Sequence, residues 1–130
     1  MRRLAITLGL LIVAGSRLAA GADKPSFVGL WKGTSVCQIK DSPCRDEGAV
    51  YTVKKGADAD SFEFSGDKVV DGQQIFMGLL ECRSGAESDT LVCKQGDAAI
   101  WTWKLDGDSM SGTLVYRGQL YRKVQLKREK

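Results

Sequence analysis

Apolar and polar residues alternate with a period of two through most of the chain after residue 22, and turn signals interrupt the alternation at intervals of about ten residues. A period of two places successive side chains on opposite faces of a strand. The same part of the sequence lacks the sustained spacing of three and four that an amphipathic helix needs. The chain is therefore predicted to be all-β.

Eight strands are predicted, at residues 27–39, 47–55, 61–70, 73–83, 90–95, 99–105, 110–117 and 120–127. Short antiparallel strands with tight turns and no covering helix bury their apolar faces most economically in an eight-stranded antiparallel up-and-down β-barrel. A two-sheet sandwich is the alternative, but its Greek-key form generally needs a longer crossing connection. A bulge in any strand would exchange the residues expected on its two faces.

The first 22 residues have the pattern of a signal peptide. Residues 1–3 give a positive start, residues 4–14 form an apolar run, and the small residues 20–22 suit cleavage before Asp23. An apolar run of about eleven residues is too short to span a bilayer. We expect an exported protein, periplasmic or secreted and without a membrane span, with a single β-barrel domain over residues 23–130.

Four cysteines lie in the part expected to be exported: Cys37, Cys44, Cys82 and Cys93. An even number in a small exported domain predicts disulfides. Three pairings are possible, and we favour Cys37 with Cys44 and Cys82 with Cys93 because each pair flanks a turn-rich stretch. Neither spacing resembles a zinc site, so we expect no metal and no cofactor.

The charge of the expected mature chain is balanced. Of 19 basic residues, Arg2, Arg3 and Arg17 belong to the predicted signal peptide, which leaves 16 basic against 16 acidic residues. This balance gives no general attraction to nucleic acid or to an anionic membrane.

Catalytic motifs are sparse. The sequence has no histidine, which excludes Ser-His and Cys-His nucleophile pairs, and it contains no phosphate loop or Gly-x-Ser-x-Gly element. The carboxylate pairs Asp58/Asp60 and Asp106/Asp108 fall where turns are needed, and neither supplies enough oxygen ligands for calcium. We expect a protein that is not an enzyme.

The opening Gly29-Leu30-Trp31 resembles the Gly-x-Trp signature of the calycin group of small barrels, which includes lipocalins, avidins and bacterial metalloprotease inhibitors. The resemblance implies that Trp31 closes one end of the barrel beneath a basic residue of the last strand. Arg122 and Arg128 both have the inward parity for this role, and both remain candidates. The Trp-Lys-Gly-Thr-Ser opening is also similar to that of uncharacterised bacterial exported proteins, which implies no activity.

Most aromatic residues fall on the faces expected to point inward, where they either line a ligand cavity or fill the core. An eight-stranded barrel is wide enough for both arrangements. The small residues Gly112 and Gly78 would leave room beside bulky neighbours. The candidate lining residues are Trp31, Tyr51, Phe62, Phe64, Phe76, Trp101, Trp103, Tyr116 and Arg122.

These observations favour an exported, non-catalytic binding protein that holds a small apolar or amphipathic ligand in the barrel. The alternative is a protein–protein module of the cell envelope, such as an inhibitor of a lysozyme or a protease, which would use the rigid loop between Cys37 and Cys44. A structural envelope component ranks third and an enzyme last. The sequence leaves the ligand, the target and the oligomeric state open.

Overall fold

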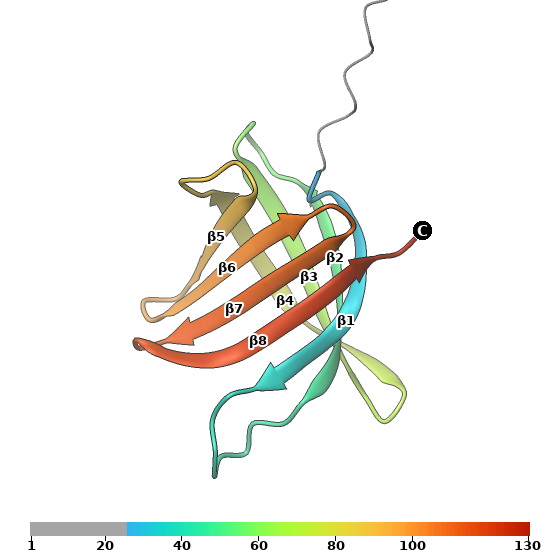
Figure 1. The fold of residues 1–130 in the computed structure, drawn as a ribbon, viewed down its shortest axis with the longest axis vertical. Helices are drawn as coiled ribbons and strands as arrows, with labels where there is room; N and C mark the ends of the chain where they lie inside the picture. The colour runs from blue at the N-terminus through green and yellow to red at the C-terminus, as the bar shows by residue number, and fades with distance from the viewer. Residues whose placement is uncertain (1–25) are drawn as a thin grey trace, which may run out of the picture.

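The structure, a computed structural model, describes residues 26–130. Within this range eight antiparallel strands pair in chain order and close into a barrel (Figure 1), which confirms the predicted up-and-down architecture. The signal peptide predicted at residues 1–22 lies outside the described residues. The strands are β1 (Gly29–Cys37), β2 (Glu47–Lys55), β3 (Ser61–Val70), β4 (Gln73–Ser84), β5 (Thr90–Gln95), β6 (Ala99–Asp106), β7 (Ser109–Tyr116) and β8 (Gln119–Arg128).

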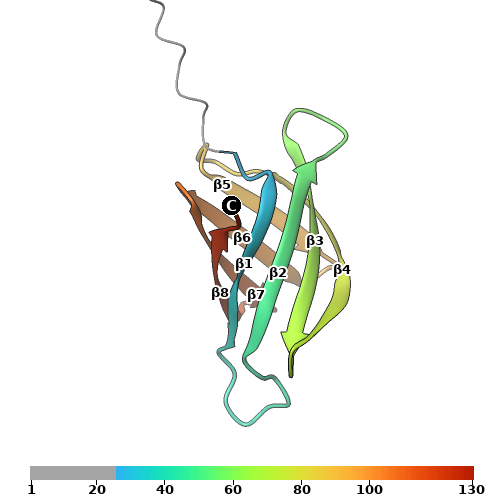
Figure 2. The same ribbon diagram turned by 90° about the vertical axis from the view of Figure 1, so that its right-hand side faces the viewer.

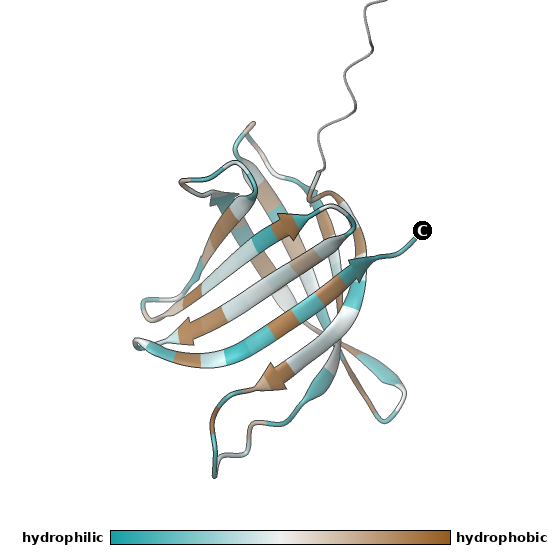
Figure 3. Cartoon of the chain, viewed as in Figure 1, coloured by the Kyte–Doolittle hydropathy of each residue, from teal (hydrophilic) through white to brown (hydrophobic). Residues whose placement is uncertain are grey.

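Side-chain alternation sorts the strands into an inner and an outer face. In β8, Val124 and Leu126 are buried while Lys123, Gln125 and Lys127 are exposed, and Figure 3 shows the resulting bands of opposite hydropathy along this strand. Burial of the apolar set against the other strands is the main driving force for closure. The alternation that predicted the strands is therefore also what forms the core.

Two of the hairpin turns have the backbone geometry of the type I′ class. Asp71 and Gly72 between β3 and β4, and Arg117 and Gly118 between β7 and β8, all have positive φ. Two-residue turns of this class match the right-handed twist of the strands that they join. They make the connections short, as the meander requires.

One end of the barrel, here called the closed end, is sealed by contacts between the beginning of β1 and the end of β8. Trp31 lies opposite Arg128 in the register, and the Arg128 guanidinium stacks 4.3 Å from the centre of the indole ring. Of the two arginines considered from the sequence, Arg128 is the one that covers Trp31. The Trp31 indole N–H donates to the Phe27 carbonyl at 2.8 Å, and Arg128 donates to the Val28 carbonyl at 2.8 Å.

Both predicted disulfides, Cys37–Cys44 and Cys82–Cys93, are present within residues 26–130. Two disulfides in a domain of this size indicate an oxidising compartment outside the cytoplasm. The Cys37–Cys44 disulfide closes the loop after β1 at the opposite end of the barrel, here called the open end (Figure 2). Cys82 and Cys93 lie directly opposite one another in β4 and β5, as expected.

The inward position predicted for Phe76 is wrong. In β4, Gly78 pairs with Gly66 and Phe76 pairs with Asp67, so Met77 is an extra residue without a partner in β3. This bulge exchanges the two faces of β4 on the side of Gln73. Phe76 consequently points away from the core and is 62% exposed.

The two disulfides should have similar effects on global stability but different local effects. Replacing either cysteine pair by alanine should lower the free energy of unfolding by about 2–3 kcal/mol, because each disulfide closes a short loop. Only Cys82→Ala/Cys93→Ala should also speed amide hydrogen exchange across β4 and β5, whose register is limited to Cys82 with Cys93, Arg83 with Val92 and Ser84 with Leu91. Urea unfolding and hydrogen-exchange mass spectrometry measure these effects. Equal exchange in the two double variants would contradict the expectation.

Candidate functional site

A cavity of about 300 Å³ occupies the open end of the barrel. All eight strands contribute to its wall: β2 and β3 give three residues each, and every other strand gives one. The lining residues are Ser35, Glu47, Ala49, Tyr51, Gly66, Asp67, Lys68, Met77, Gln95, Trp101, Leu114 and Arg122.

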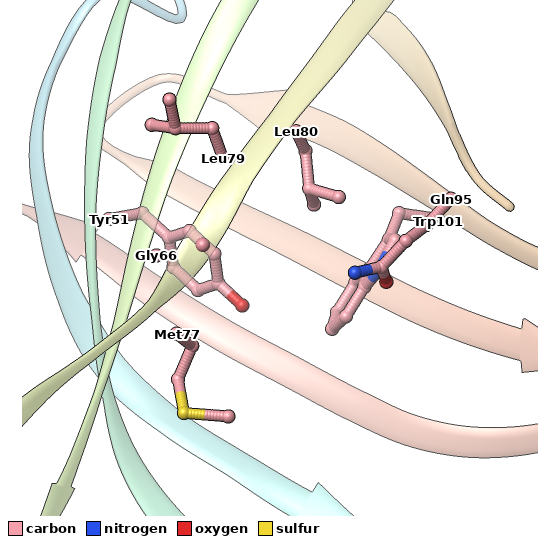
Figure 4. Close-up of a pocket in the computed structure, with 8 residues that line it drawn as sticks. Tyr51, Gly66, Met77, Leu79, Leu80, Gln95 and Trp101 are labelled. Atoms are coloured by element: carbon pink, nitrogen blue, oxygen red, sulfur yellow. The ribbon is translucent and has the colours of Figure 1, made fainter.

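The floor of the cavity is aromatic. Tyr51 and Trp101 are both more than nine-tenths buried, and Figure 4 shows them on either side of a space that Met77 and Leu80 also border. Trp101 is held in place because its indole N–H donates to the Gln95 side-chain oxygen at 3.2 Å and its ring stacks on Trp103 with 5.6 Å between centroids. The floor is therefore a fixed surface that an apolar or aromatic group can contact.

The rim of the cavity is polar and centres on Arg122. Its guanidinium donates to the Ser35 hydroxyl at 3.0 Å and to the Arg45 carbonyl at 3.1 Å. A carboxylate oxygen of Glu47 lies 3.7 Å from one of its nitrogens. These contacts hold the guanidinium at the cavity, and because the group has five N–H donors, some remain for a further acceptor.

The closed half of the barrel is solid by comparison. Trp103 packs against Tyr51 and Phe64, with centroid distances of 5.0 and 5.2 Å. A Cβ atom on Gly112 would lie 2.3 Å from the Trp103 ring, so the indole fills the room that this glycine leaves. At Gly78, by contrast, nothing lies within 4 Å of such an atom, and this residue borders the space shown in Figure 4.

Eight of the nine candidate lining residues divide between these two halves, and the ninth lies outside the barrel. Tyr51, Trp101 and Arg122 line the cavity. Trp31, Phe64 and Trp103 belong to the packed core, and Phe62 packs against it beside Phe27. Tyr116 is at the open end, half exposed and in contact with Tyr121. Phe76 lies outside, as described above.

Sequence reasoning missed most of the polar lining, namely Ser35, Glu47, Asp67, Lys68 and Gln95. In a period-two pattern these residues look like ordinary strand ends. Glu47 had one usable signal: it shares inward parity with Ala49 and Tyr51. Met77 is a different case, because only the bulge turns it toward the cavity.

The groups that the site presents are suited to noncovalent binding. Among residues 26–130, no three histidine, cysteine, aspartate or glutamate side chains gather in a group that could hold a metal ion. The same part of the chain contains no helix long and apolar enough to cross a membrane. What the site does present is an aromatic floor and a largely enclosed cation, Arg122, a combination suited to binding an amphipathic molecule.

Comparison of the sequence with protein-family models and with curated proteins finds no match.

Tyr51 should make stability depend on pH in the alkaline range. Burial, and next the negative charge of Glu47, raise the pKa of its hydroxyl from 10.0 to about 12, against a lowering effect of Arg122. Because the unfolded chain ionises first, this contribution is intact below pH 10 and is lost between pH 10 and about 12. The loss should amount to about 2–3 kcal/mol.

Urea unfolding of the protein and of Tyr51→Phe across this range measures the effect. The variant lacks the ionisable group, so the difference between the two free energies of unfolding should change as the pH rises through this window. A difference that stays constant with pH would show that the Tyr51 hydroxyl is not held in a desolvated environment.

Proposed function

We propose that the protein is a non-catalytic binding protein that holds a small amphipathic molecule at the open end of its barrel. The observation that carries the proposal is the cavity of about 300 Å³ with Tyr51 and Trp101 below and Arg122 at the rim. Its volume lies at the lower end of the range for small-molecule sites, roughly 300–1,000 Å³. Export and a calycin-like relationship belong to the same proposal, supported by the two disulfides and by Arg128 stacked on Trp31.

The charges at the site favour a ligand with an anionic head. Arg122 is largely enclosed, with 14% of its side chain exposed, and a cation in such a position interacts more strongly than one in free solvent. Lys68 adds a second cation to the lining, and Glu47 and Asp67 balance the two, so the preference depends on where Arg122 lies and not on net charge. An apolar body would rest on Trp101, with its anionic group toward Arg122.

Tryptophan fluorescence tests this proposal with 1-anilinonaphthalene-8-sulfonate, an aromatic anion, as the probe. Binding should change the emission of Trp101, the one tryptophan of the three that lines the cavity, and Trp101→Phe should remove most of the change. Arg122→Met should weaken binding roughly tenfold, because it removes a charge-assisted contact.

Lys123→Met is the matched control, since it removes the neighbouring cation from the exposed outer face of β8. Binding by this variant should equal that of the unchanged protein. Near-ultraviolet circular dichroism establishes that each variant is folded. Equal affinity of folded Arg122→Met and Lys123→Met, or an unchanged response in Trp101→Phe, would place the probe elsewhere and refute the cavity as the site.

A second candidate function is inhibition of an envelope enzyme through the Cys37–Cys44 loop. The loop projects beyond the strands at the open end (Figure 2), and internal contacts fix it. The Ser42 hydroxyl donates to the Ile39 carbonyl at 3.2 Å and accepts from the Cys44 N–H at 3.2 Å, and Arg45 donates to the Ser42 carbonyl at 2.7 Å. A rigid loop loses little conformational entropy on docking.

This candidate predicts that the protein slows a lysozyme or a secreted metalloprotease at micromolar concentration. Cys37→Ala/Cys44→Ala should weaken inhibition because the loop then has to be ordered on binding. The control is the Cys82→Ala/Cys93→Ala variant, which removes the disulfide between β4 and β5 and leaves the Cys37–Cys44 loop unchanged. No inhibition by the unchanged protein, or equal inhibition by both double variants, would speak against the loop.

A further inference from the structure

Strand β4 has an unpaired edge. Its register with β5 extends only from Cys82 to Ser84, although its register with β3 runs on to Gln73. Within the described residues, the edge of β4 that faces β5 therefore lacks a strand partner from Gln73 to Glu81. Figure 2 shows β4 at the margin of the molecule. On the outer surface where the two strands diverge, Glu81, Arg83, Val92 and Lys94 line a groove of about 480 Å³.

The same segment is the most apolar part of the exposed surface. Phe76, Met77 and Leu79 are 62%, 59% and 58% exposed, and Ile75 is 42% exposed. Residues 73–80 contain no charged residue and no proline. Natural sheets protect exposed edges with lysine, proline, bulges or covering segments, and of these devices residues 73–80 have only the bulge at Met77. Such an edge is a template for an added strand.

We propose that this edge pairs with the β4 edge of a second copy of the chain, antiparallel and about a two-fold axis. The bulge fixes the register. Because Met77 is inserted, Phe76 and Leu79 lie on one face of β4, opposite Asp67 and Ser65 of β3. Ile75 and Leu80 lie on the other face, opposite Lys68 and Phe64.

In an antiparallel pair, residues directly opposite one another lie on the same face of the sheet. The register that meets this condition on both sides of the bulge places Met77 opposite Gly78 of the second copy. The remaining pairs follow from this centre. Phe76 meets Leu79 on the outer face, Ile75 meets Leu80 on the inner face, and Gln74 meets Glu81, whose carboxylate can accept from the Gln74 amide. Phe76, Ile75, Leu79 and Leu80 each oppose an apolar side chain, Met77 faces the open space at Gly78, and no like charges oppose one another.

A second copy fits this edge better than a charged partner does. The segment offers no charge before Glu81 to recognise an acidic or basic strand, whereas an isologous interface needs only self-complementarity. Residues 26–130 carry 15 basic and 15 acidic side chains, obtained by removing Arg2, Arg3, Arg17, Lys24 and Asp23 from the totals of 19 and 16. Two copies therefore approach without net repulsion.

Sedimentation velocity of the oxidised protein over about 1–100 µM tests the proposal. A reversible dimer is expected. Leu79→Lys should raise its dissociation constant about tenfold or more, because it buries a charge opposite Phe76. Ile100→Lys is the matched control: Ile100 is 43% exposed, in a strand paired on both sides, and this variant should dimerise like the unchanged protein. Hydrogen exchange of residues 73–81 should slow as the dimer forms.

Several results would overturn the proposal. The protein remains a monomer at the highest concentration, or it forms aggregates in place of a discrete dimer. Folded Leu79→Lys dimerises as well as Ile100→Lys, which would place the interface elsewhere. In the monomer, protection of those amides of residues 73–81 that point away from β3 would mean that another segment of the same chain covers the edge. The probe titration with Arg122→Met is independent of these measurements, so the ligand site and the dimer fail separately.

Discussion

The barrel depends on the pairing of β8 with β1, because a meander of strands becomes a closed barrel only when the last strand pairs with the first, and this register begins with Arg128 opposite Trp31. Arg128 stacks on the indole, donates to the Val28 and Ser26 carbonyls, and forms an ion pair with Asp108 in the turn between β6 and β7. A Cβ atom on Gly29 would come within 3.0 Å of the guanidinium, and the φ of this residue is +147°. Glycine at this position thus permits the close approach that seals the end.

The sealed end and the open end differ because the strands do not pair equally along their lengths. At the closed end every neighbouring strand pair is in register, and aromatic rings fill the interior. Toward the open end β4 leaves β5, so the wall loses one ladder of hydrogen bonds there. The Cys82–Cys93 disulfide stands where the two strands still meet and holds the barrel together at that point. The cavity lies in the half where closure is incomplete.

Sequence reasoning reached the strands, the turns and the disulfides because each depends on local signals. A period of two indicates a strand, a glycine beside a polar residue indicates a turn, and cysteines that flank a turn indicate a disulfide. Each of these signals extends over only a few residues. Arg122 and Arg128 could not be distinguished, since they share parity and differ only in height along the barrel. Phe76 was misplaced because a bulge leaves no reliable mark in one sequence. The polar lining depends on which strand ends meet, which only the register of all eight strands determines.

The extra residue in β4 connects the two surfaces on which function is proposed. Met77 lines the cavity and also belongs to the unpaired edge, and Gly78 beside it has a φ of +143° that other residues rarely adopt. A ligand in the cavity and a second copy at the edge would therefore both contact Met77. Any difference in ligand affinity between monomer and dimer must then appear as an equal difference in dimer affinity between the free and bound protein. The bulge is the element through which such coupling would act.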